Sequence, residues 1–443
     1  METPIADFLR RYDSAGMARF HMPGHKGKAF LGCEPLDITE VRGADALYEA
    51  ESIIAQSEAN ATALFSSQRT CYSTEGSSQC IRAMLYLALT CRPAGTAPVI
   101  VAARNVHKAF VYAAALLDFE VVWLWPEESA SLCACPVSQE SLEKTLASLS
   151  VPPAAVYLTS PDYLGNMADI AALAEVCHRH GTLLTVDNAH GAYLRFLSPS
   201  QHPLDLGADL CCDSAHKTLP VLTGGAYLHI SQHAPAALAE NAKSALALFG
   251  STSPSYLTMA SLDLCNGYLA AGYPARLAET VERLKQVRSC LRAAGWQVED
   301  SDPLRLILRA PEGLTGTALA DRLRQGGVEC EYADGDYLVL MATPENTPFD
   351  FDRLLAALGE NRAHYAPHAS LPLAKGERVC SIREALFAPQ ETLPFRQALG
   401  RVCGAPTVSC PPAIPIAVSG ERIGEEALAL FRNYGVQTVD VLK

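Results

Sequence analysis

Residues 211–225 read CCDSAHKTLPVLTGG, and AYLHI follows at 226–230. The apolar residues up to Cys212 predict a short buried strand that ends just before Lys217. Small and hydroxyl residues surround this lysine, and His216 precedes it. A solvated surface lysine needs no such surroundings. A lysine that attacks a carbonyl carbon must lose its proton, and removal from water favours that loss.

Continuous apolar runs recur along the first 230 residues, as is typical of strands buried on both faces. These runs are 98–103, 119–125, 155–159, 182–186, 208–212 and 225–230. Helical patterns lie between several of them, at 77–91, 106–117 and 169–180. The alternation predicts an α/β fold built on a mostly parallel sheet.

The pattern changes in the second half of the chain. A helix-like stretch at 255–294 leads out of the first region, and from about residue 295 strand-like and helix-like segments start again. We predict an N-terminal segment at 1–45, a large domain at 46–280 and a smaller α+β domain at 281–443. Residues 366–375, PHASLPLAKG, are expected to form a linker within the smaller domain.

Composition limits the function classes. The chain has 443 residues, 19% of them charged, and a net charge of −13. This argues against disorder and against nucleic acid as a partner. No apolar run reaches the roughly 18–20 residues that span a bilayer, so no membrane partner is expected. The 15 cysteines are scattered, without a CxxC pair. We therefore expect no metal site, and a reduced, cytoplasmic protein.

Polar residues gather where the predicted strands end, the edge at which open parallel sheets bind ligands. Asp187 follows one strand, His107 follows another, and STEGSS at 73–78 precedes a helix. Each has an ordinary explanation as a turn residue, a structural histidine or a helix cap. Together with Lys217 they fit one cofactor, pyridoxal phosphate (PLP), which needs a Schiff-base lysine, an acid for the ring nitrogen, a stacking ring and a phosphate cup.

Longer motifs resemble the Orn/Lys/Arg decarboxylase family, the basic amino-acid decarboxylases of PLP fold type I. They run nearly from end to end: FHMPGHKGKAF at 20–30, LDITEVRGADAL at 36–47, DNAHGAYL at 187–194, DSAHKTLPVLTGGAYLHI at 213–230, TSPSYLTMASLD at 252–263, SIREAL at 381–386 and PPAIPIAVSGERI at 411–423. The resemblance implies a mostly parallel seven-stranded sheet flanked by helices, with a smaller α+β C-terminal domain. It implies the short form of the family, without the N-terminal wing domain of its long members.

The resemblance also implies roles for individual residues. Lys217 would bind the cofactor as a Schiff base, Asp187 would keep the pyridine nitrogen protonated, and His107 and Ala189 would pack on the two ring faces. The other cofactor-binding residues it implies are Ser77, Ser78, His190, Ser214, His216, Thr252 and Ser253. In the family the active site is shared across a homodimer, so Thr252 and Ser253 would reach the phosphate of a neighbouring subunit.

The implied reaction is decarboxylation of arginine, lysine or ornithine to the amine and CO2, with His216 or Lys217 returning a proton to Cα. The sequence leaves open which of the three is used and whether the amine serves polyamine biosynthesis. Two alternatives remain. One is another type I PLP enzyme, an aminotransferase or a lyase, for which Arg383 is a candidate carboxylate ligand. The other is a catalytically silent PLP-binding homologue.

Four positions depart from the family pattern. Ala44 stands where the family has an aspartate, Glu75 lies close to the expected phosphate, Ala413 replaces a glycine and Ser419 a proline. Glu421, beside Ser419, could face the distal cation of a substrate. These departures leave the cofactor residues intact and bear on the choice of substrate and on activity.

Overall fold

The computed structural model describes residues 1–126, 131–366, 372–406 and 413–443. Half of the expected linker, residues 367–371, lies outside the described residues, as do Pro411 and Pro412 of the C-terminal motif. The chain forms two compact units. The first comprises 1–96, 149–158 and 169–276, and the second comprises 97–148, 159–168 and 277–443.

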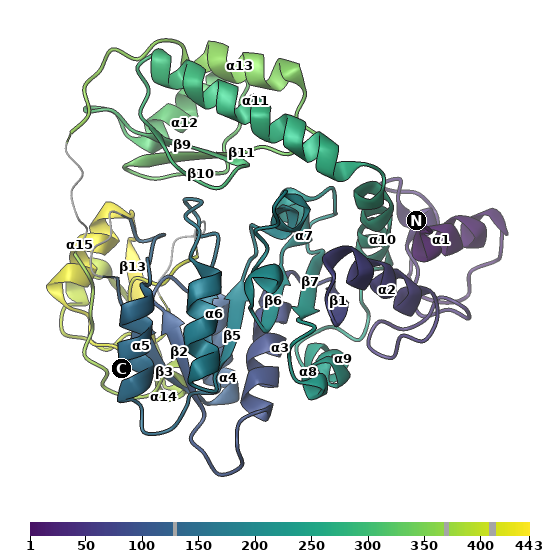
Figure 1. The fold of residues 1–443 in the computed structure, drawn as a ribbon, viewed down its shortest axis with the longest axis horizontal. Helices are drawn as coiled ribbons and strands as arrows, with labels where there is room; N and C mark the ends of the chain where they lie inside the picture. The colour runs from purple at the N-terminus through teal and green to yellow at the C-terminus, as the bar shows by residue number, and fades with distance from the viewer. Residues whose placement is uncertain (127–130, 367–371, 407–412) are drawn as a thin grey trace. The chain divides into compact units, whose positions relative to one another are not determined.

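The main sheet has seven strands in the order β1-β7-β6-β5-β4-β2-β3 (Figure 1). Its strands are β1 Arg69–Ser73, β2 Val99–Ala103, β3 Glu120–Leu124, β4 Ala155–Thr159, β5 Leu183–Asp187, β6 Leu210–Asp213 and β7 Ala226–Ile230. β2 runs parallel to β3 and β5 parallel to β6, whereas β7 is antiparallel to both of its neighbours. The predicted α/β fold with a mostly parallel seven-stranded sheet is confirmed. The six apolar runs are strands, and β1 was not predicted.

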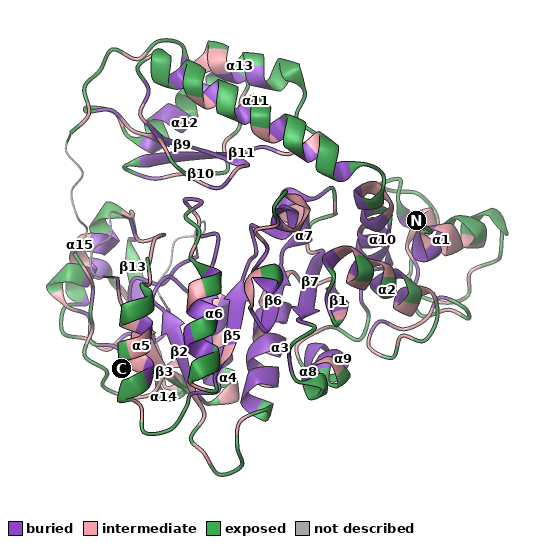
Figure 2. Cartoon of the chain, viewed as in Figure 1, coloured by how far each residue is buried: buried purple, intermediate pink, exposed green. Residues whose placement is uncertain are grey.

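Helices of the first unit cover the buried strands. They are α1 Pro4–Ser14, η1 Glu34–Leu36, α2 Ile53–Phe65, α3 Ser77–Thr90, α6 Ile170–Arg179, η2 Ala192–Phe196, η3 Pro203–Leu206, α7 Ala215–Thr218, α8 Ala236–Glu240, α9 Ala242–Ala247 and α10 Tyr256–Ala270. α3 packs against β5, β6 and β7, and α6 packs against β5. Every residue of β6 and β7 is buried (Figure 2), which explains why these strands appear in the sequence as apolar runs without alternation.

The second unit contains two further sheets. One has four antiparallel strands in the order β10-β11-β9-β8, namely β10 Tyr332–Ala333, β11 Tyr337–Met341, β9 Arg305–Arg309 and β8 Val298–Glu299. The other pairs β12 Gln390–Pro394 with β13 Thr438–Leu442. The remaining helices are α4 Lys108–Leu117, α5 Gln139–Ser148, α11 Tyr273–Ala293, α12 Gly316–Gln325, α13 Pro348–Leu358, α14 Ile382–Phe387, η4 Phe395–Gln397 and α15 Glu425–Asn433, with α11 beginning in the first unit.

The pairing of β12 with β13 was not predicted, because its two strands are more than 40 residues apart and no pattern in one segment specifies the other. Both strands lie beside a hydrophobic cluster of their own, which includes Phe395, Phe431 and Val441. The region predicted to form a smaller α+β domain thus holds two sheets. No helix within the described parts of the chain is long and apolar enough to cross a membrane.

Candidate active site

Lys217 lies just beyond the end of β6, as its position in the sequence predicts. The strand ends at Asp213, and the short helix α7 then carries His216 and Lys217. The half-buried Lys217 places its Nζ 2.9 Å from Nε2 of the buried His190. A proton can therefore pass between the amine and the imidazole, which is what a lysine nucleophile requires.

Asp187 is the last residue of the neighbouring strand β5, and its carboxyl group is buried. Tyr157, from β4, donates its hydroxyl to Oδ2 at 3.0 Å, and the backbone N–H of Ala189 donates to Oδ1 at 3.2 Å. Burial raises the pKa of Asp187, while the positive charge of Lys217 and these donors oppose that rise. The carboxylate is thus held in a low-dielectric site where a cationic ring nitrogen would stabilise it.

The 73–78 stretch forms the turn between β1 and α3, so Ser77 and Ser78 begin a helix as expected. Gly76 has φ +70°, and no atom lies within 4 Å of the position that a Cβ would take there. The buried Oγ1 of Thr74 has no hydrogen-bond partner among the described residues. A helix N-terminus with open space and an unpaired hydroxyl suits an anion such as a phosphate.

Gly224 and Gly225 connect this turn to the lysine loop. The N–H of Gly76 donates to the carbonyl of Gly224 at 2.8 Å, and Nδ1 of His216 lies 3.0 Å from the carbonyl of Gly225. Since a carbonyl only accepts, Nδ1 of His216 carries a proton. Gly224 has φ +94°, and a Cβ there would lie 2.9 Å from the carbonyl oxygen of Thr74. The glycine pair therefore permits the close approach of the two loops.

The structure thus brings together, in the first unit, the loops that carry Asp187, Ala189 and His190, those that carry Ser214, His216 and Lys217, and the turn with Ser77 and Ser78. The other expected residues belong to other segments of the chain. His107 is the N-cap of α4 in the second unit, where its Nδ1 accepts the N–H of Ala109 at 3.1 Å. Thr252 and Ser253 lie in an exposed loop before α10. Their roles at the cofactor remain predictions.

The structure shows the environment of two residues that depart from the family pattern, Ala44 and Glu75. Ala44 is fully buried, so an aspartate there would need a buried partner. Its neighbour Asp45 accepts four backbone N–H groups, from residues 46, 51, 52 and 54, at 2.8–3.1 Å. Burial opposes ionisation of Asp45, but these donors lower its pKa, so it caps the start of α2 as an anion. Glu75 is exposed to solvent.

Glu421 already has a cationic partner in the second unit. It is buried, and its Oε2 lies 3.2 Å from Nη2 of Arg104. The guanidinium of Arg104 also stacks between the rings of Trp123 and Trp125, at 5.1 and 5.2 Å. This ion pair does not support the expectation that Glu421 faces a substrate cation. Ser419 beside it is buried as well.

Arg383 is likewise engaged. Its Nη1 donates to the carbonyl of Ala115 at 2.8 Å, at the C-terminal end of α4. A guanidinium in this place satisfies helix carbonyls and interacts favourably with the helix dipole. The structure gives Arg383 a capping role and offers no support for it as the carboxylate ligand of an aminotransferase.

Three residues whose hydrogen bonds the sequence did not reveal lie at this edge of the sheet: Tyr157, Asn188 and Asp213. Tyr157 is hidden within an apolar strand, where a tyrosine is as common in a core as at a site. Asn188 and Asp213 lie inside recognised motifs, but nothing in the sequence pairs them. The structure places Asn188 Nδ2 2.7 Å from Asp213 Oδ1.

The residues at this edge suit PLP: an amine after β6, a buried carboxylate at the end of β5 and an anion-binding turn after β1, all strands of one sheet. Ser77, Ser78 and the α3 N-terminus would hold the phosphate, Asp187 the ring nitrogen and Lys217 the aldehyde carbon.

Comparisons with known proteins agree with this interpretation. The sequence model described as Orn/Lys/Arg decarboxylase, major domain, matches residues 3–306. An arginine decarboxylase of Bacillus subtilis (strain 168) is 29% identical over 98% of this chain and 94% of its own length. The uncharacterized protein YaaO of the same organism is 28% identical over 97% of this chain and 93% of its own.

Solved structures agree on the fold. The lysine decarboxylase LdcF of Francisella novicida superposes with a TM-score of 0.81 and 16% identity, over 100% of this chain and 81% of that one. The likeness places the fold among the PLP fold type I enzymes. The chain belongs to the Orn/Lys/Arg decarboxylase family, whose members decarboxylate amino acids with pyridoxal phosphate.

Proposed function

We propose that the protein decarboxylates a basic amino acid with PLP, and that L-arginine is the first substrate to test. The observation that carries the reaction is the arrangement of Lys217, His190 and Asp187 at the ends of two neighbouring parallel strands. The choice of arginine rests on the curated relatives named arginine decarboxylase, which match nearly the whole chain. L-lysine and L-ornithine remain candidates.

The chain's own residues supply the binding and proton-handling parts of this chemistry. When bound, PLP provides an electron-accepting ring for the bonding pair that CO2 leaves behind. Asp187 would hold negative charge toward the ring nitrogen, and Tyr157 donates its hydroxyl to that carboxylate. Lys217 Nζ, in contact with His190, is positioned to return a proton to Cα. The Nδ1 proton of His216 is directed at the Gly225 carbonyl, so we favour Lys217 as the proton donor.

A second copy of the chain is part of this proposal. Five large apolar side chains of the N-terminal segment are exposed: Met17 62%, Phe20 97%, Met22 66%, Phe30 80% and Leu31 90%. So many exposed apolar side chains within 15 residues are unusual for a monomer and are typical of an interface. We therefore propose a homodimer in which Thr252 and Ser253 serve the neighbouring site. Changing Phe20, Phe30 and Leu31 together to serine should yield monomers in light scattering, and an unchanged dimer would contradict this assignment.

The test of the reaction is release of amine and CO2 from PLP-loaded protein. L-Arginine, L-lysine and L-ornithine are offered separately, and L-alanine with a keto acid serves as the transamination control. Agmatine, cadaverine or putrescine would identify the substrate. Release of no amine, with normal cofactor absorbance, would refute the decarboxylase and leave the aminotransferase, lyase and silent-homologue alternatives.

Two variants test the site itself. Lys217→Arg keeps the cation but cannot condense with an aldehyde, so the visible absorbance of the PLP-loaded protein should disappear. Cofactor that becomes covalently attached to the variant on borohydride reduction would refute the assignment of Lys217. Asp187→Ala should retain some cofactor and lose most turnover, and full activity would remove Asp187 from the mechanism.

A further inference from the structure

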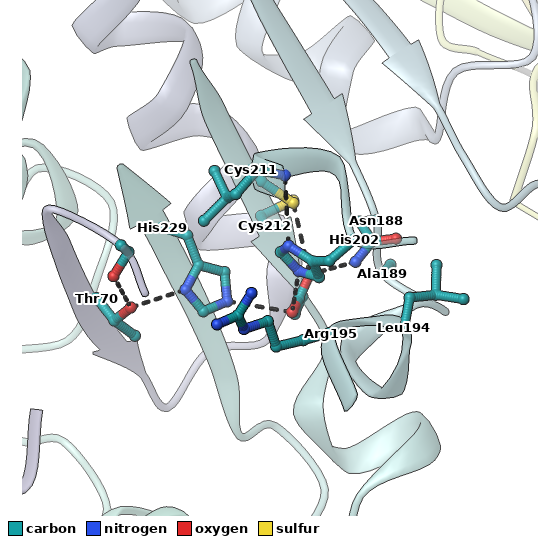
Figure 3. A network of polar contacts seen from close by, with 12 residues as sticks. Thr70, Asn188, Ala189, Leu194, Arg195, His202, Cys211, Cys212 and His229 are labelled. Carbon is teal, nitrogen blue, oxygen red and sulfur yellow. Dashed lines mark hydrogen bonds and ion pairs between the residues drawn. The ribbon is translucent and has the colours of Figure 1, made fainter. Parts of the chain in front are cut away.

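Asp213 is a fully buried carboxylate at the end of β6, four residues before Lys217. Four donors from four segments surround it, and Figure 3 labels them: Asn188 after β5, His202 before η3, Cys211 in β6 and His229 in β7. Its Oδ1 accepts Nδ2 of Asn188 at 2.7 Å and the thiol of Cys211 at 3.6 Å, and its Oδ2 lies 3.1 Å from Nε2 of both His202 and His229. Burial opposes ionisation, yet the two imidazoles keep the pKa of Asp213 below its ordinary value.

The hydrogen-bond directions around Asp213 bear on whether this cluster could bind a metal ion. The ligand atoms of His202, Cys211 and Asp213 lie within 4.8 Å of one another, a spacing that could hold a metal. However, the backbone N–H of Leu204 donates to Nδ1 of His202, so in the neutral ring the Nε2 proton faces Asp213. The cluster is therefore an anion held by donors and has no vacant ligand atom for a metal.

His229 shows the same arrangement. Its Nδ1 lies 2.8 Å from the hydroxyl of Thr70, and burial lowers the pKa of His229. A neutral ring can accept from Thr70 at Nδ1 and donate to Asp213 at Nε2. Two imidazoles thus fix one carboxylate oxygen, and the other oxygen faces Asn188.

Asn188 links this anion to the neighbouring loop. It follows Asp187 and precedes Ala189 and His190. The pairing of β5 with β6 ends here, with the N–H of Asn188 donating to the carbonyl of Cys212 at 3.0 Å. The side-chain hydrogen bond between Asn188 and Asp213 therefore joins the two segments just beyond the last backbone hydrogen bond between β5 and β6.

Gly191 makes room for the Asn188 side chain. A Cβ at residue 191 would lie 1.9 Å from Oδ1 of Asn188, although the φ of Gly191 itself, −119°, is ordinary. The buried Oδ1 of Asn188 has no hydrogen-bond partner among the described residues, so the side chain is held through its Nδ2. This explains why a glycine closes the DNAHG motif: the space it leaves is occupied by the amide.

We propose that the hydrogen bond between Asn188 and Asp213 is a brace that positions Lys217. Through Asn188 it holds the loop that carries Asp187 and His190, and through Asp213 it holds the loop that carries Lys217. Asn188 and Asp213 are positioning residues, because no contact of theirs is with the reacting amine. The catalytic consequence rests on the proposed function, whereas the connection between the loops does not.

A double-mutant cycle tests the brace. Asn188→Asp places a second carboxylate 2.7 Å from Asp213, and two buried carboxylates at that distance cannot both ionise. Adding Asp213→Asn restores one carboxylate and one amide with the direction of the bond reversed, and the amide oxygen can still accept from both imidazoles. Asp213→Asn alone completes the cycle.

We expect Asn188→Asp alone to lower kcat/KM roughly tenfold to a hundredfold, since small misplacements at a reaction centre have effects of that size. It should also shift the pH dependence of the cofactor absorbance and lower the unfolding midpoint of cofactor-free protein. The double variant should return all three toward the wild-type values, with kcat/KM within about threefold of wild type. If Asn188→Asp alone does not fold, recovery of folding in the double variant would show the same energetic coupling between residues 188 and 213.

Asn266→Asp is the matched control. Asn266 is also fully buried, and its Nδ2 donates to Tyr72 and Ser57, away from the lysine loop. This variant should lower the unfolding midpoint while leaving kcat/KM and the absorbance titration unchanged at temperatures well below that midpoint.

The proposal is overturned if the double variant is as impaired as Asn188→Asp, or does not fold, or if Asn188→Asp behaves as wild type in all three measurements. It is also overturned if Asn266→Asp reproduces the shift in absorbance. Failure of the proposed function is distinguishable: wild-type protein would then release no amine, while the unfolding midpoints of the cofactor-free variants would still report the coupling.

Discussion

Tyr157→Phe is the most direct test of how the structure holds Asp187. The substitution removes a single hydroxyl that donates to Asp187 Oδ2 at 3.0 Å, and both side chains are buried. The ring stays in place, so no large cavity forms. The ionised carboxylate loses one of its donors in a site where burial already raises the pKa of Asp187.

The magnitude follows from that single contact. A hydrogen bond to a charged group contributes about 1.5–3 kcal/mol, and each 1.4 kcal/mol is about tenfold in an equilibrium or a rate. If the ionised form of Asp187 is required, kcat/KM should fall roughly tenfold to a hundredfold. The substitution should raise the pKa of Asp187 and lower kcat/KM, because loss of a donor disfavours the ionised carboxylate proposed to face the ring nitrogen.

The assay is steady-state decarboxylation with PLP in excess, combined with titration of the cofactor absorbance against pH. Tyr72→Phe is the matched control, since Tyr72 is also fully buried and hydrogen-bonds to Ser57 and Asn266 away from Asp187. The control should lose stability and keep kcat/KM within about twofold of wild type. Equal kcat/KM for Tyr157→Phe and wild type, with unchanged absorbance, would refute a role for this hydroxyl.

Three further predictions concern stability. Asp45→Ala removes the acceptor of four backbone N–H groups at the start of α2, so it should lower the free energy of unfolding by about 1–2 kcal/mol in urea titrations; no change would show that water replaces the cap. Ala413→Gly should raise the free energy of unfolding by up to about 1 kcal/mol, because Ala413 is buried with φ +62°, where a Cβ is unfavourable; a loss of stability in the same titration would contradict this. Asp162→Asn tests a pH effect. Burial raises the pKa of Asp162 to about 6, above its unfolded value, so folding disfavours its ionisation and the free energy of unfolding should fall as pH rises from about 4 to 6. Urea titrations at several pH values across that range measure this dependence. The free energy of unfolding of the variant should fall less with pH than that of wild type. An identical pH dependence for both proteins would show that Asp162 does not contribute to it.

The centre of the candidate site could be located from the sequence. Lys217 and Asp187 each follow an apolar run, and parallel strands end at one edge of a sheet, so the pattern of runs predicts that the two side chains lie close together. The family motifs added the cofactor and the reaction. The positions of the two strand ends could be predicted because they depend on short contiguous stretches, whose strand character comes from local burial on both faces.

The contacts that hold the site could not be predicted in this way. Tyr157 and Asp187 are 30 residues apart, Asn188 and Asp213 are 25 apart, and Arg104 and Glu421 are 317 apart. Each pair depends on strand register or on packing between distant segments, and no pattern in one segment specifies its partner in the other. The same limit explains why Glu421 and Arg383 suggested ligand roles, when the structure gives them Arg104 and the carbonyls of α4 as partners. The groups that we propose to carry the chemistry could therefore be identified from short stretches of sequence, whereas the side chains that contact them could be identified only from the folded chain. The physical reason is that a hydrogen bond requires atoms about 3 Å apart, and sequence separation does not report that distance.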